Sequence, residues 1–237
     1  MSVSMTHASL DGPSEYRTLA ATHQHEVEIS RSRFLALLSP AATEEDARAC
    51  VATARRGHPQ ARHHCTAFVL GPRRDVRRTS DDGEPSGTAG APMLDALLAA
   101  EVSDVVAVVV RHFGGVLLGT GGLARAYRGA VADALAGAPL VLRRRRTLLR
   151  VTLDYADAAA VTALAERAGW GVSARYGVDV ELDLAVPPDA AGASVTRIAA
   201  TTAGRGRATP SGTAWVDQPW PDHPQDETHH TRAPGTA

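Results

Sequence analysis

The sequence contains no lysine, and arginine supplies all 25 of its basic residues. The missing lysine excludes Schiff-base catalysis and the lysine-dependent phosphate loop of nucleotide hydrolases. Aromatic residues form only 4% of the chain, which leaves little material for a single-strand-binding surface built on stacked rings. The formal net charge of -1 gives no overall attraction to a phosphate backbone. Any contact with nucleic acid must therefore depend on a local group of arginines.

Cysteine is scarce too, because the chain has only Cys50 and Cys65. Their spacing fits neither a disulfide framework nor a structural zinc site, and two buried thiols in a reducing compartment are the expected state. The longest apolar run, residues 105–110, is far too short to cross a bilayer, and the first residues lack the basic and apolar stretches of a secretion signal. These absences predict a cytoplasmic protein with no membrane partner.

The length of 237 residues, with 44% apolar and 22% charged residues, is typical of one large or two small globular domains. We predict two α+β domains, at residues 21–142 and 143–217. Residues 1–20 and 218–237 have little periodicity and many small or polar residues. They are predicted to be a mobile N-terminal segment and a disordered tail.

The first domain is predicted to mix strands with helices. Thr43 suits a helix N-cap, and the acidic residues after it suit the first turn of a helix. Residues 104–111 form a valine-rich strand, and the residues between its charged ends are apolar on both faces, as in the centre of a sheet. The expected elements are strands within residues 25–38 and at 63–70, 76–79 and 104–111, and helices at residues 44–57, from Pro92, and up to Gly137.

The second domain follows a run of four arginines at residues 143–146. This run could grip ribosomal or transfer RNA as an electrostatic patch, but a solvated interdomain linker is the favoured interpretation. The pattern after it predicts the βαββαβ order of a ferredoxin-like sandwich. The elements are expected at residues 148–154, 157–168, 170–186, 190–203 and 207–216.

Residues 80–90 form a loop that combines acids, hydroxyls and glycines. The carboxylates of Asp81, Asp82 and Glu84 could coordinate magnesium or act as acid and base, so they are weak catalytic candidates. Alternatively the loop is a rigid turn, and the hydroxyls of Ser86 and Thr88 cap the helix that follows. The composition favours this structural interpretation, and neither a metal nor a cofactor is expected.

A second loop, at residues 113–122, is rich in glycine and leads into a helix. Gly121 or Gly122 would open this helix with free N–H groups, which can hold a phosphate. The spacing matches no established nucleotide-binding motif. Arg111, Arg125 and Arg128 could still bind an RNA phosphate or a small anion. The alternative is that these arginines pair with the carboxylates of the first loop.

One dense group of nitrogen and sulfur ligands consists of His58, His63, His64 and Cys65. Neighbouring residues on a strand point to opposite faces, so His63 and His64 cannot easily share a metal ion. A nucleophile pair of Cys65 with a histidine is conceivable. An inward-facing Cys65 with one solvent-facing histidine is the expected arrangement.

The two loops carry long motifs. The first is residues 80–90 followed by Pro92-Met93-Leu94, and the second is Arg111-His112-Phe113-Gly114-Gly115 with Leu118-Gly119-Thr120-Gly121-Gly122-Leu123 and Arg125-Ala126-Tyr127. Both resemble hallmarks of the IMPACT/YigZ family, and Ser32-Arg33-Phe34 and His58-Pro59 with His64-Cys65 resemble shorter pieces of its pattern. The resemblance covers residues 20–137 closely. Residues 146–216 resemble the C-terminal domain of bacterial two-domain members.

The resemblance implies an N-terminal domain with the ribosomal-protein-S5-like fold of elongation factor G domain IV, and a ferredoxin-like C-terminal domain similar to domain V. These folds imply contact with the ribosome or with structured RNA. Eukaryotic members of the family regulate translation initiation through an additional N-terminal domain that is not expected here, so their partner-dependent role is not transferred. The family implies no established catalytic residue.

We therefore expect a translation-linked binding protein rather than an enzyme, with no DNA sequence specificity. Its two motif loops would contact the ribosome or structured RNA. The alternatives are a small-molecule hydrolase or transferase that uses the acidic loop, and a protein-interaction module. The predicted binding residues are Ser86, Thr88, Arg111, His112, Gly114, Gly115, Gly119, Thr120, Gly121, Gly122 and Arg125.

Overall fold

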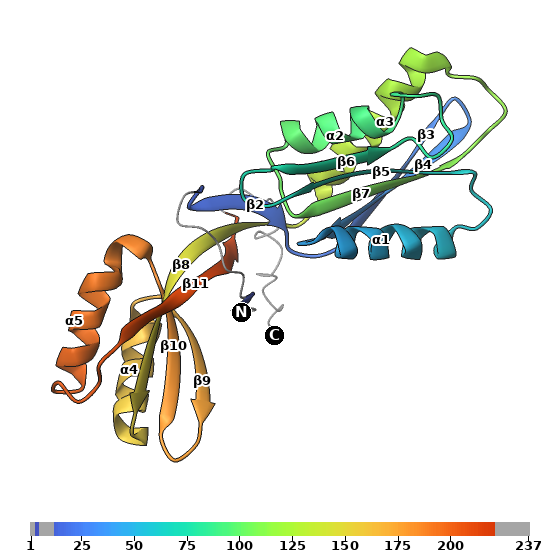
Figure 1. Cartoon of the computed structure of the whole chain (residues 1–237). Helices are drawn as coiled ribbons and strands as arrows, with labels where there is room; N and C mark the ends of the chain where they lie inside the picture. The colour runs from blue at the N-terminus through green and yellow to red at the C-terminus, as the bar shows by residue number, and fades with distance from the viewer. Residues whose placement is uncertain (1–2, 5–11, 221–237) are drawn as a thin grey trace, which may run out of the picture. The chain divides into compact units, whose positions relative to one another are not determined.

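The computed structural model describes residues 3–4 and 12–220, which divide into two compact units. The N-terminal unit comprises Tyr16–Leu142 and residues 219–220, and the C-terminal unit comprises Arg143–Gln218 and the described residues up to Glu15. Each unit combines a β-sheet with α-helices (Figure 1), so the chain has a mixed α+β fold, as predicted. Among the described residues, each helix is too short or too polar to span a bilayer.

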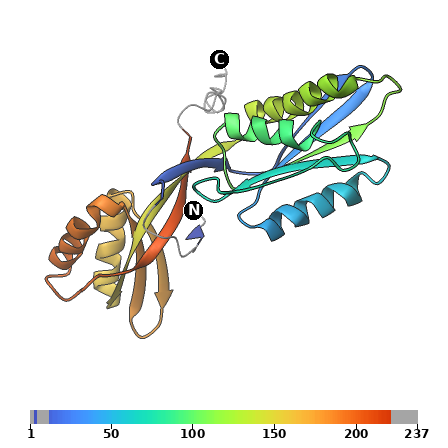
Figure 2. The same ribbon diagram turned by 45° about the horizontal axis from the view of Figure 1, so that its top comes forward.

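The N-terminal unit is built on a five-stranded sheet in which all neighbouring strands are antiparallel. The strands lie in the order β3 (His23–Ile29), β4 (Ser32–Pro40), β7 (Val105–His112), β5 (His63–Leu70) and β6 (Val76–Ser80). Helix α1 (Glu44–Gly57) covers one face of the sheet, and α2 (Gly90–Ala99) and α3 (Gly119–Gly137) cover the other, as Figure 2 shows. These elements follow the order that the sequence predicts.

Strand β7 lies in the middle of this sheet. Successive side chains on a strand point to opposite faces, so a strand that is apolar throughout must be covered on both. Its residues alternate between two cores, with Val105, Ala107 and Val109 under α2 and α3, and Val106, Val108 and Val110 under α1. The prediction of a central strand is confirmed.

Helix α1 begins where its capping residues predict. The Thr43 side chain accepts a hydrogen bond from the Asp46 backbone N–H at 3.1 Å, and the Asp46 carboxylate accepts one from the Thr43 N–H at 2.9 Å. This capping box satisfies two backbone donors, and Glu44 and Glu45 suit the positive end of the helix dipole. The helix ends at Gly57, also as predicted.

The C-terminal unit contains a sheet in the order β11-β8-β10-β9, with the short strand β1 (Val3–Ser4) beside β11. Its elements follow the chain as strand, helix, strand pair, helix and strand, which is the predicted order. They are β8 (Leu140–Leu153), α4 (Tyr155–Arg167), β9 (Gly171–Tyr176), β10 (Val180–Val186), the short 3-10 helix η1 (Pro188–Ala190), α5 (Ala191–Thr201) and β11 (Thr209–Pro219).

The four-arginine run is not a solvated linker, which corrects the interpretation that the sequence favoured. Residues 143–146 lie inside strand β8 and are half-buried. The Arg143 guanidinium donates to the Asp217 carboxylate at 2.6 and 3.0 Å, and Arg144 donates to Glu15 at 2.9 Å. Carboxylates far away in the sequence therefore neutralise part of the run, which lets an arginine-rich segment form a strand.

The N-terminal segment also differs from its prediction, because Glu15–Leu19 forms strand β2. Leu19 is buried in the core beneath α2 and α3, and the Tyr16 hydroxyl donates to the Asp104 carboxylate at 2.5 Å. The prediction of a mobile segment at residues 1–20, which rested on their lack of periodicity, is therefore wrong for residues 15–19. At the other end β11 reaches Pro219, and residues 221–237 of the predicted tail lie outside the described residues.

Truncation of Leu19 tests whether β2 belongs to the core. We expect Leu19→Ala to lower the free energy of unfolding by about 2–5 kcal/mol, because it removes a buried side chain and leaves a cavity. The matched control is Leu117→Ala at an exposed position, with an expected change within about 0.5 kcal/mol. Urea unfolding followed by circular dichroism measures both. Equal stability of the two variants would place β2 outside the core.

Candidate functional site

The two motif loops meet at one end of the N-terminal sheet. We call residues 81–89 the acidic loop and residues 113–118 the glycine loop. The acidic loop follows β6 and the glycine loop follows β7, and both strands pair with β5. The register places Ser80 opposite Thr66 and Arg111 opposite His63, so both loops leave the sheet near the start of β5.

Asp81 organises the acidic loop from within. Its carboxylate accepts hydrogen bonds from the backbone N–H groups of Gly87 at 2.8 Å, Ala89 at 3.0 Å and Gly90 at 2.8 Å. Burial alone would raise the pKa of this carboxyl, but the three donors outweigh burial and hold the pKa below its ordinary value. Asp81 is therefore a structural anion that closes the loop onto the start of α2.

This arrangement corrects the predicted cap of α2. The N-cap residue is Ala89, and no side chain of Ala89 can serve as a cap. The Thr88 hydroxyl instead donates to the Pro85 carbonyl oxygen at 2.6 Å, and Ser86 is exposed. The Asp81 carboxylate reaches the first N–H groups of the helix from eight and nine residues away, which a search for an adjacent capping hydroxyl cannot detect.

Asp82 ties the acidic loop to helix α1 and strand β5. Its carboxylate accepts from the His64 backbone N–H at 2.7 Å and from the Arg55 guanidinium at 2.6 Å. Burial opposes these contacts, yet together they lower the pKa of Asp82. The His64 ring is buried with one nitrogen 3.2 Å from the His58 carbonyl oxygen, and burial followed by the nearby Arg55 charge lowers its pKa.

Glu84 and Arg111 form a buried ion pair between the two motifs. The Arg111 Nη1 donates to Glu84 Oε1 at 2.7 Å, and the Tyr127 hydroxyl donates to the same oxygen at 2.8 Å. The guanidinium also lies over the rings of Phe34 and Phe113, at 5.4 and 5.5 Å from their centres. Its Nε is buried without a hydrogen-bond partner among the described residues. One pair thus joins the acidic loop, β7, β4 and α3.

Cys65 belongs to the same buried network. Its Sγ lies 3.0 Å from the Asp81 carbonyl oxygen and 3.3 Å from the Tyr127 hydroxyl oxygen. Burial raises the pKa of the Cys65 thiol to about 12, and burial also raises the pKa of Tyr127. A thiol in this state is a poor nucleophile because the thiolate is the reactive form. The inward orientation expected for Cys65 is what the structure shows.

Two of the histidines near Cys65, His63 and His64, contact backbone carbonyl oxygens. The His63 Nδ1 lies 3.0 Å from the Asp82 carbonyl oxygen, and the ring centres of His58 and His112 are 6.3 Å apart. Within the part of the chain that the structure describes, no three side chains of histidine, cysteine, aspartate or glutamate are grouped so that they could hold a metal ion.

The glycine loop carries exposed apolar side chains. Phe113 is 51% exposed, Val116 39% and Leu117 87%. Gly114 lets this loop pass close to the turn between β3 and β4, because a Cβ on it would lie 1.7 Å from the Arg31 carbonyl oxygen. Three exposed apolar side chains on one short loop make this loop a candidate contact surface.

Helix α3 begins beside this loop with free backbone donors. Its N-cap is Leu118, which makes no side-chain capping bond, and its first turn contains no acid. Gly119, Thr120 and Gly121 are exposed there, and Gly119 has a φ of +68°, which favours glycine. The exposed Arg125 folds back toward this end, with Nη1 3.5 Å from the Cβ position on Gly121.

The structure therefore divides the predicted binding residues into an inner and an outer group. Arg111, Thr88 and Gly114 serve the packing of the loops. His112 is half-buried, and the exposed outer group, with Gly122 partly buried behind it, is Ser86, Gly115, Gly119, Thr120, Gly121 and Arg125. Sequence reasoning placed Tyr127 and Ser32 in the family motifs but gave neither a role in the site. In the structure the Tyr127 hydroxyl donates to Glu84, and the Ser32 hydroxyl accepts from the Arg111 guanidinium at 3.3 Å. The sequence does contain a signal for Tyr127, because it ends the R-A-Y motif with a hydroxyl group, and a buried hydroxyl needs a hydrogen-bond partner.

Comparisons with known proteins find matches in both units of the chain. Residues 30–135 match the Impact N-terminal domain, and residues 151–205 match a domain of unknown function, DUF1949. An IMPACT family member of Haemophilus influenzae is 44% identical over 155 residues, which cover 65% of this chain and 75% of that protein. The IMPACT family member YigZ of Escherichia coli is 43% identical over 165 residues, which cover 68% and 80%.

The chain belongs to the IMPACT family. Membership implies a translation-related regulatory protein. A crystal structure described as that of a hypothetical protein matches this family member with a TM-score of 0.61 and 35% identity, over 84% of this chain and 98% of the other. The structural match therefore includes the N-terminal unit, which carries both motifs, and part of the C-terminal unit as well.

Removal of the Glu84 charge tests the buried pair. We expect Glu84→Gln to lower the free energy of unfolding by about 3–5 kcal/mol, because it leaves the Arg111 charge buried without a counterion. The control Glu101→Gln breaks the exposed pair of Glu101 with Arg17, with an expected loss below about 1 kcal/mol. The double variant Glu84→Gln with Arg111→Met should lose less than the sum of its single changes. Strict additivity in urea unfolding would contradict the pairing.

Two glycine-to-alanine changes should have opposite signs. Gly114→Ala places a methyl group against the Arg31 backbone, so we expect a loss of about 3 kcal/mol or more. Gly129 lies inside α3 with no atom within 4 Å of its Cβ position. Gly129→Ala should therefore raise stability by roughly 0.5–1 kcal/mol. Thermal unfolding compares the two, and a harmless Gly114→Ala would refute the close approach.

Proposed function

We propose that this IMPACT family member is a non-enzymatic, translation-linked protein that contacts ribosomal or other structured RNA through the glycine loop and the start of α3. The observation that carries the proposal is the uncapped, exposed start of α3 with the Arg125 guanidinium folded toward it. Free backbone N–H groups and the helix dipole attract an anion, and a guanidinium adds a charged donor to the same place. A backbone phosphate is the anion that RNA presents.

Phe113 supports the same proposal. One face of its ring lies over the buried Arg111 guanidinium, while half of the side chain remains exposed. A ring held in this way can stack on an unpaired base, and such stacking contributes about 1–3 kcal/mol per base. A phosphate site and a stacking ring on one short segment match the chemistry of a nucleotide better than that of a lone anion.

The acidic loop gives catalysis little support. Asp81 is bonded to three backbone donors, Asp82 to Arg55 and His64, and Glu84 to Arg111 and Tyr127. A groove of about 640 Å³ lies elsewhere in the N-terminal unit, and none of these three carboxylates lines it. A general acid or base needs access to a substrate. The geometry therefore favours a binding protein over a hydrolase or transferase.

The fold resemblances extend the proposal to the whole chain. The order βαββαβ with strands arranged as β11-β8-β10-β9 supports a ferredoxin-like assignment for the C-terminal unit. The N-terminal unit is proposed to be ribosomal-protein-S5-like, as the family resemblance implies. If both units share their folds with domains of elongation factor G, as proposed, the ribosome is the favoured RNA partner, and we propose a cytoplasmic location on the same basis.

A protein partner is the second candidate. Leu117 is 87% exposed and Val116 lies beside it on the same loop. Aliphatic side chains contribute little to phosphate or base contacts but much to a protein interface. This candidate predicts binding that depends on Leu117 and persists at high salt after nuclease treatment.

Co-sedimentation with ribosomes across a salt series tests the proposed function. Arg125→Glu should weaken binding by about tenfold or more and reduce the slope of log affinity against log salt by about 1, because one phosphate contact is lost. Phe113→Ala should weaken binding with little change in the slope. The control is Arg73→Glu, an exposed arginine just beyond Leu70, at the opposite end of β5.

The possible outcomes distinguish an RNA contact from a protein contact at this surface. Loss of binding in Arg125→Glu but not in Arg73→Glu supports the phosphate contact. Binding that is insensitive to both arginines and to salt, yet lost in Leu117→Asp, would favour the protein partner. No sedimentation of the wild-type chain at low salt would refute the proposed function. Circular dichroism confirms that each variant is folded.

A further inference from the structure

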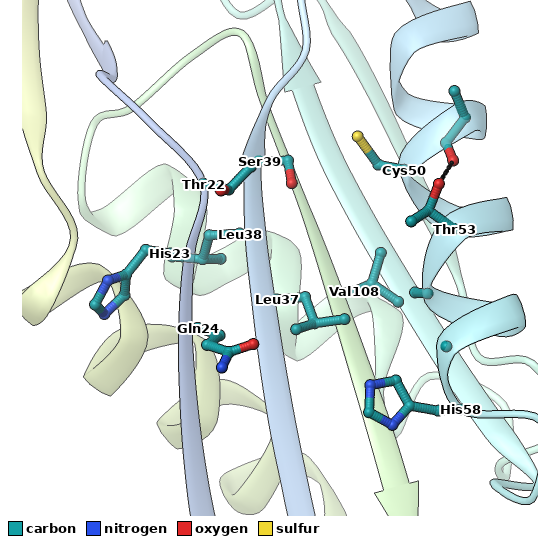
Figure 3. Close-up of a pocket in the computed structure, with 13 residues that line it drawn as sticks. Thr22, His23, Gln24, Leu37, Leu38, Ser39, Cys50, Thr53, His58 and Val108 are labelled. Carbon is teal, nitrogen blue, oxygen red and sulfur yellow. Dashed lines mark hydrogen bonds between the residues drawn. The ribbon is translucent and has the colours of Figure 1, made fainter.

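The N-terminal unit has a groove on the face of the sheet that α1 covers. It lies between α1 and strands β3 and β4, with a volume of about 640 Å³ (Figure 3). Leu37 and Val108 form its apolar floor, Cys50 and Thr53 approach it from α1, and His58 approaches it from just after the end of α1. None of the functional residues of the motif loops lines it.

The groove exists because one helix covers a sheet that is five strands wide. On this face the core between α1 and the sheet contains residues of α1, β4, β5, β6 and β7 together with Ala41 and Ala61 of the connecting loops, and no residue of β3 belongs to it. On the opposite face Val27 and Ile29 of β3 pack against the core beneath α2 and α3. The α1 face therefore has room for a second helix alongside α1, over β3 and β4.

The walls of the groove suit an apolar helix face. The α1 residues that line it, Ala49, Cys50, Thr53, Ala54 and Gly57, are all small, so another backbone can come close. Among the residues that line the groove, none is aspartate, glutamate or arginine. The floor therefore favours small and medium-sized apolar side chains.

The β3 rim of the groove is acidic. Residues directly opposite each other in a sheet share a face, and Gln24 pairs with Leu37 and Glu26 with Leu35. Glu28 follows on the same face of β3, and Glu26 and Glu28 are both exposed. Arg33 lies 3.6 Å from Glu26 in an exposed and weak pair, which leaves the rim with a net negative charge.

We propose that this groove binds a basic amphipathic helix of a partner protein. Its apolar face would lie on Leu35, Leu37 and Val108 beside α1, and its arginine or lysine side chains would face Glu26 and Glu28. The helix would complete a two-helix layer that matches the one on the opposite face. This docking site is separate from the proposed RNA contact at the glycine loop.

Cys50 provides a local reporter for the test. It is half-buried and lines the groove, whereas Cys65 is fully buried in the network beneath the motif loops. Alkylation by iodoacetamide should therefore modify Cys50 selectively, and a Cys50→Ser variant verifies this assignment. The probes are three synthetic peptides: an amphipathic helix of leucine, alanine and arginine, the same helix with glutamate for arginine, and a scrambled basic sequence without an apolar face.

The basic amphipathic peptide should slow alkylation of Cys50 in the full chain by about tenfold at saturation, while the acidic and scrambled peptides should bind at least about tenfold more weakly. The double variant Glu26→Arg with Glu28→Arg should lose the preference for the basic peptide and gain affinity for the acidic one. The matched control Asp95→Arg with Asp133→Arg changes the same charge on α2 and α3, which cover the opposite face, and should leave binding unchanged.

Three results would overturn the proposal. One is an unchanged alkylation rate with the basic peptide up to about 1 mM, the weak end of specific binding. Another is equal protection by the scrambled peptide, which would reduce the interaction to general charge attraction. The third is protection by the neutral dye N-phenyl-1-naphthylamine without protection by any peptide, which would assign the groove to a small apolar ligand.

Discussion

The ion pair between Glu84 and Arg111 is the contact on which the arrangement of the motif loops depends. Both side chains are almost fully buried, and a buried charge is tolerated only when a partner compensates for its lost hydration. The Tyr127 hydroxyl and the rings of Phe34 and Phe113 complete the surroundings of the pair. Because its members come from the acidic loop, two strands and α3, the loops cannot move apart without exposing an unpaired charge to a low-dielectric core.

This constraint explains why a motif rich in charged residues is mostly structural. Asp81 closes its own loop, Asp82 holds α1 and β5, and Glu84 joins the two motifs. The inner residues make the loops rigid, and rigidity lowers the entropy lost when the outer residues bind a partner. The exposed start of α3 and the apolar tip of the glycine loop are therefore presented by a preorganised support.

Local patterns predicted much of the fold. Thr43 and the acids after it fixed the start of α1, since a cap and the helix dipole involve only near neighbours in the chain. Uninterrupted valines placed β7 in the centre of its sheet. Local patterns failed for residues 143–146 and 15–19, where strands form because distant side chains neutralise arginines or bury Leu19. The prediction of the α2 cap was wrong for the same reason, because the acceptor is the Asp81 carboxylate, which lies just after β6 rather than next to the helix.

The sequence by itself determined the order of the elements, the two long motifs and the family, because periodicity, capping and motif spacing are properties of consecutive residues. Tertiary structure decided which charged residues are available to a partner. Arg111 and Arg125 are indistinguishable as candidates in the sequence, yet Arg111 meets a carboxylate 27 residues away in the core and Arg125 remains at the surface. The pairing of a buried charge depends on which distant groups the sheet brings within a few ångströms, and no local pattern contains that information.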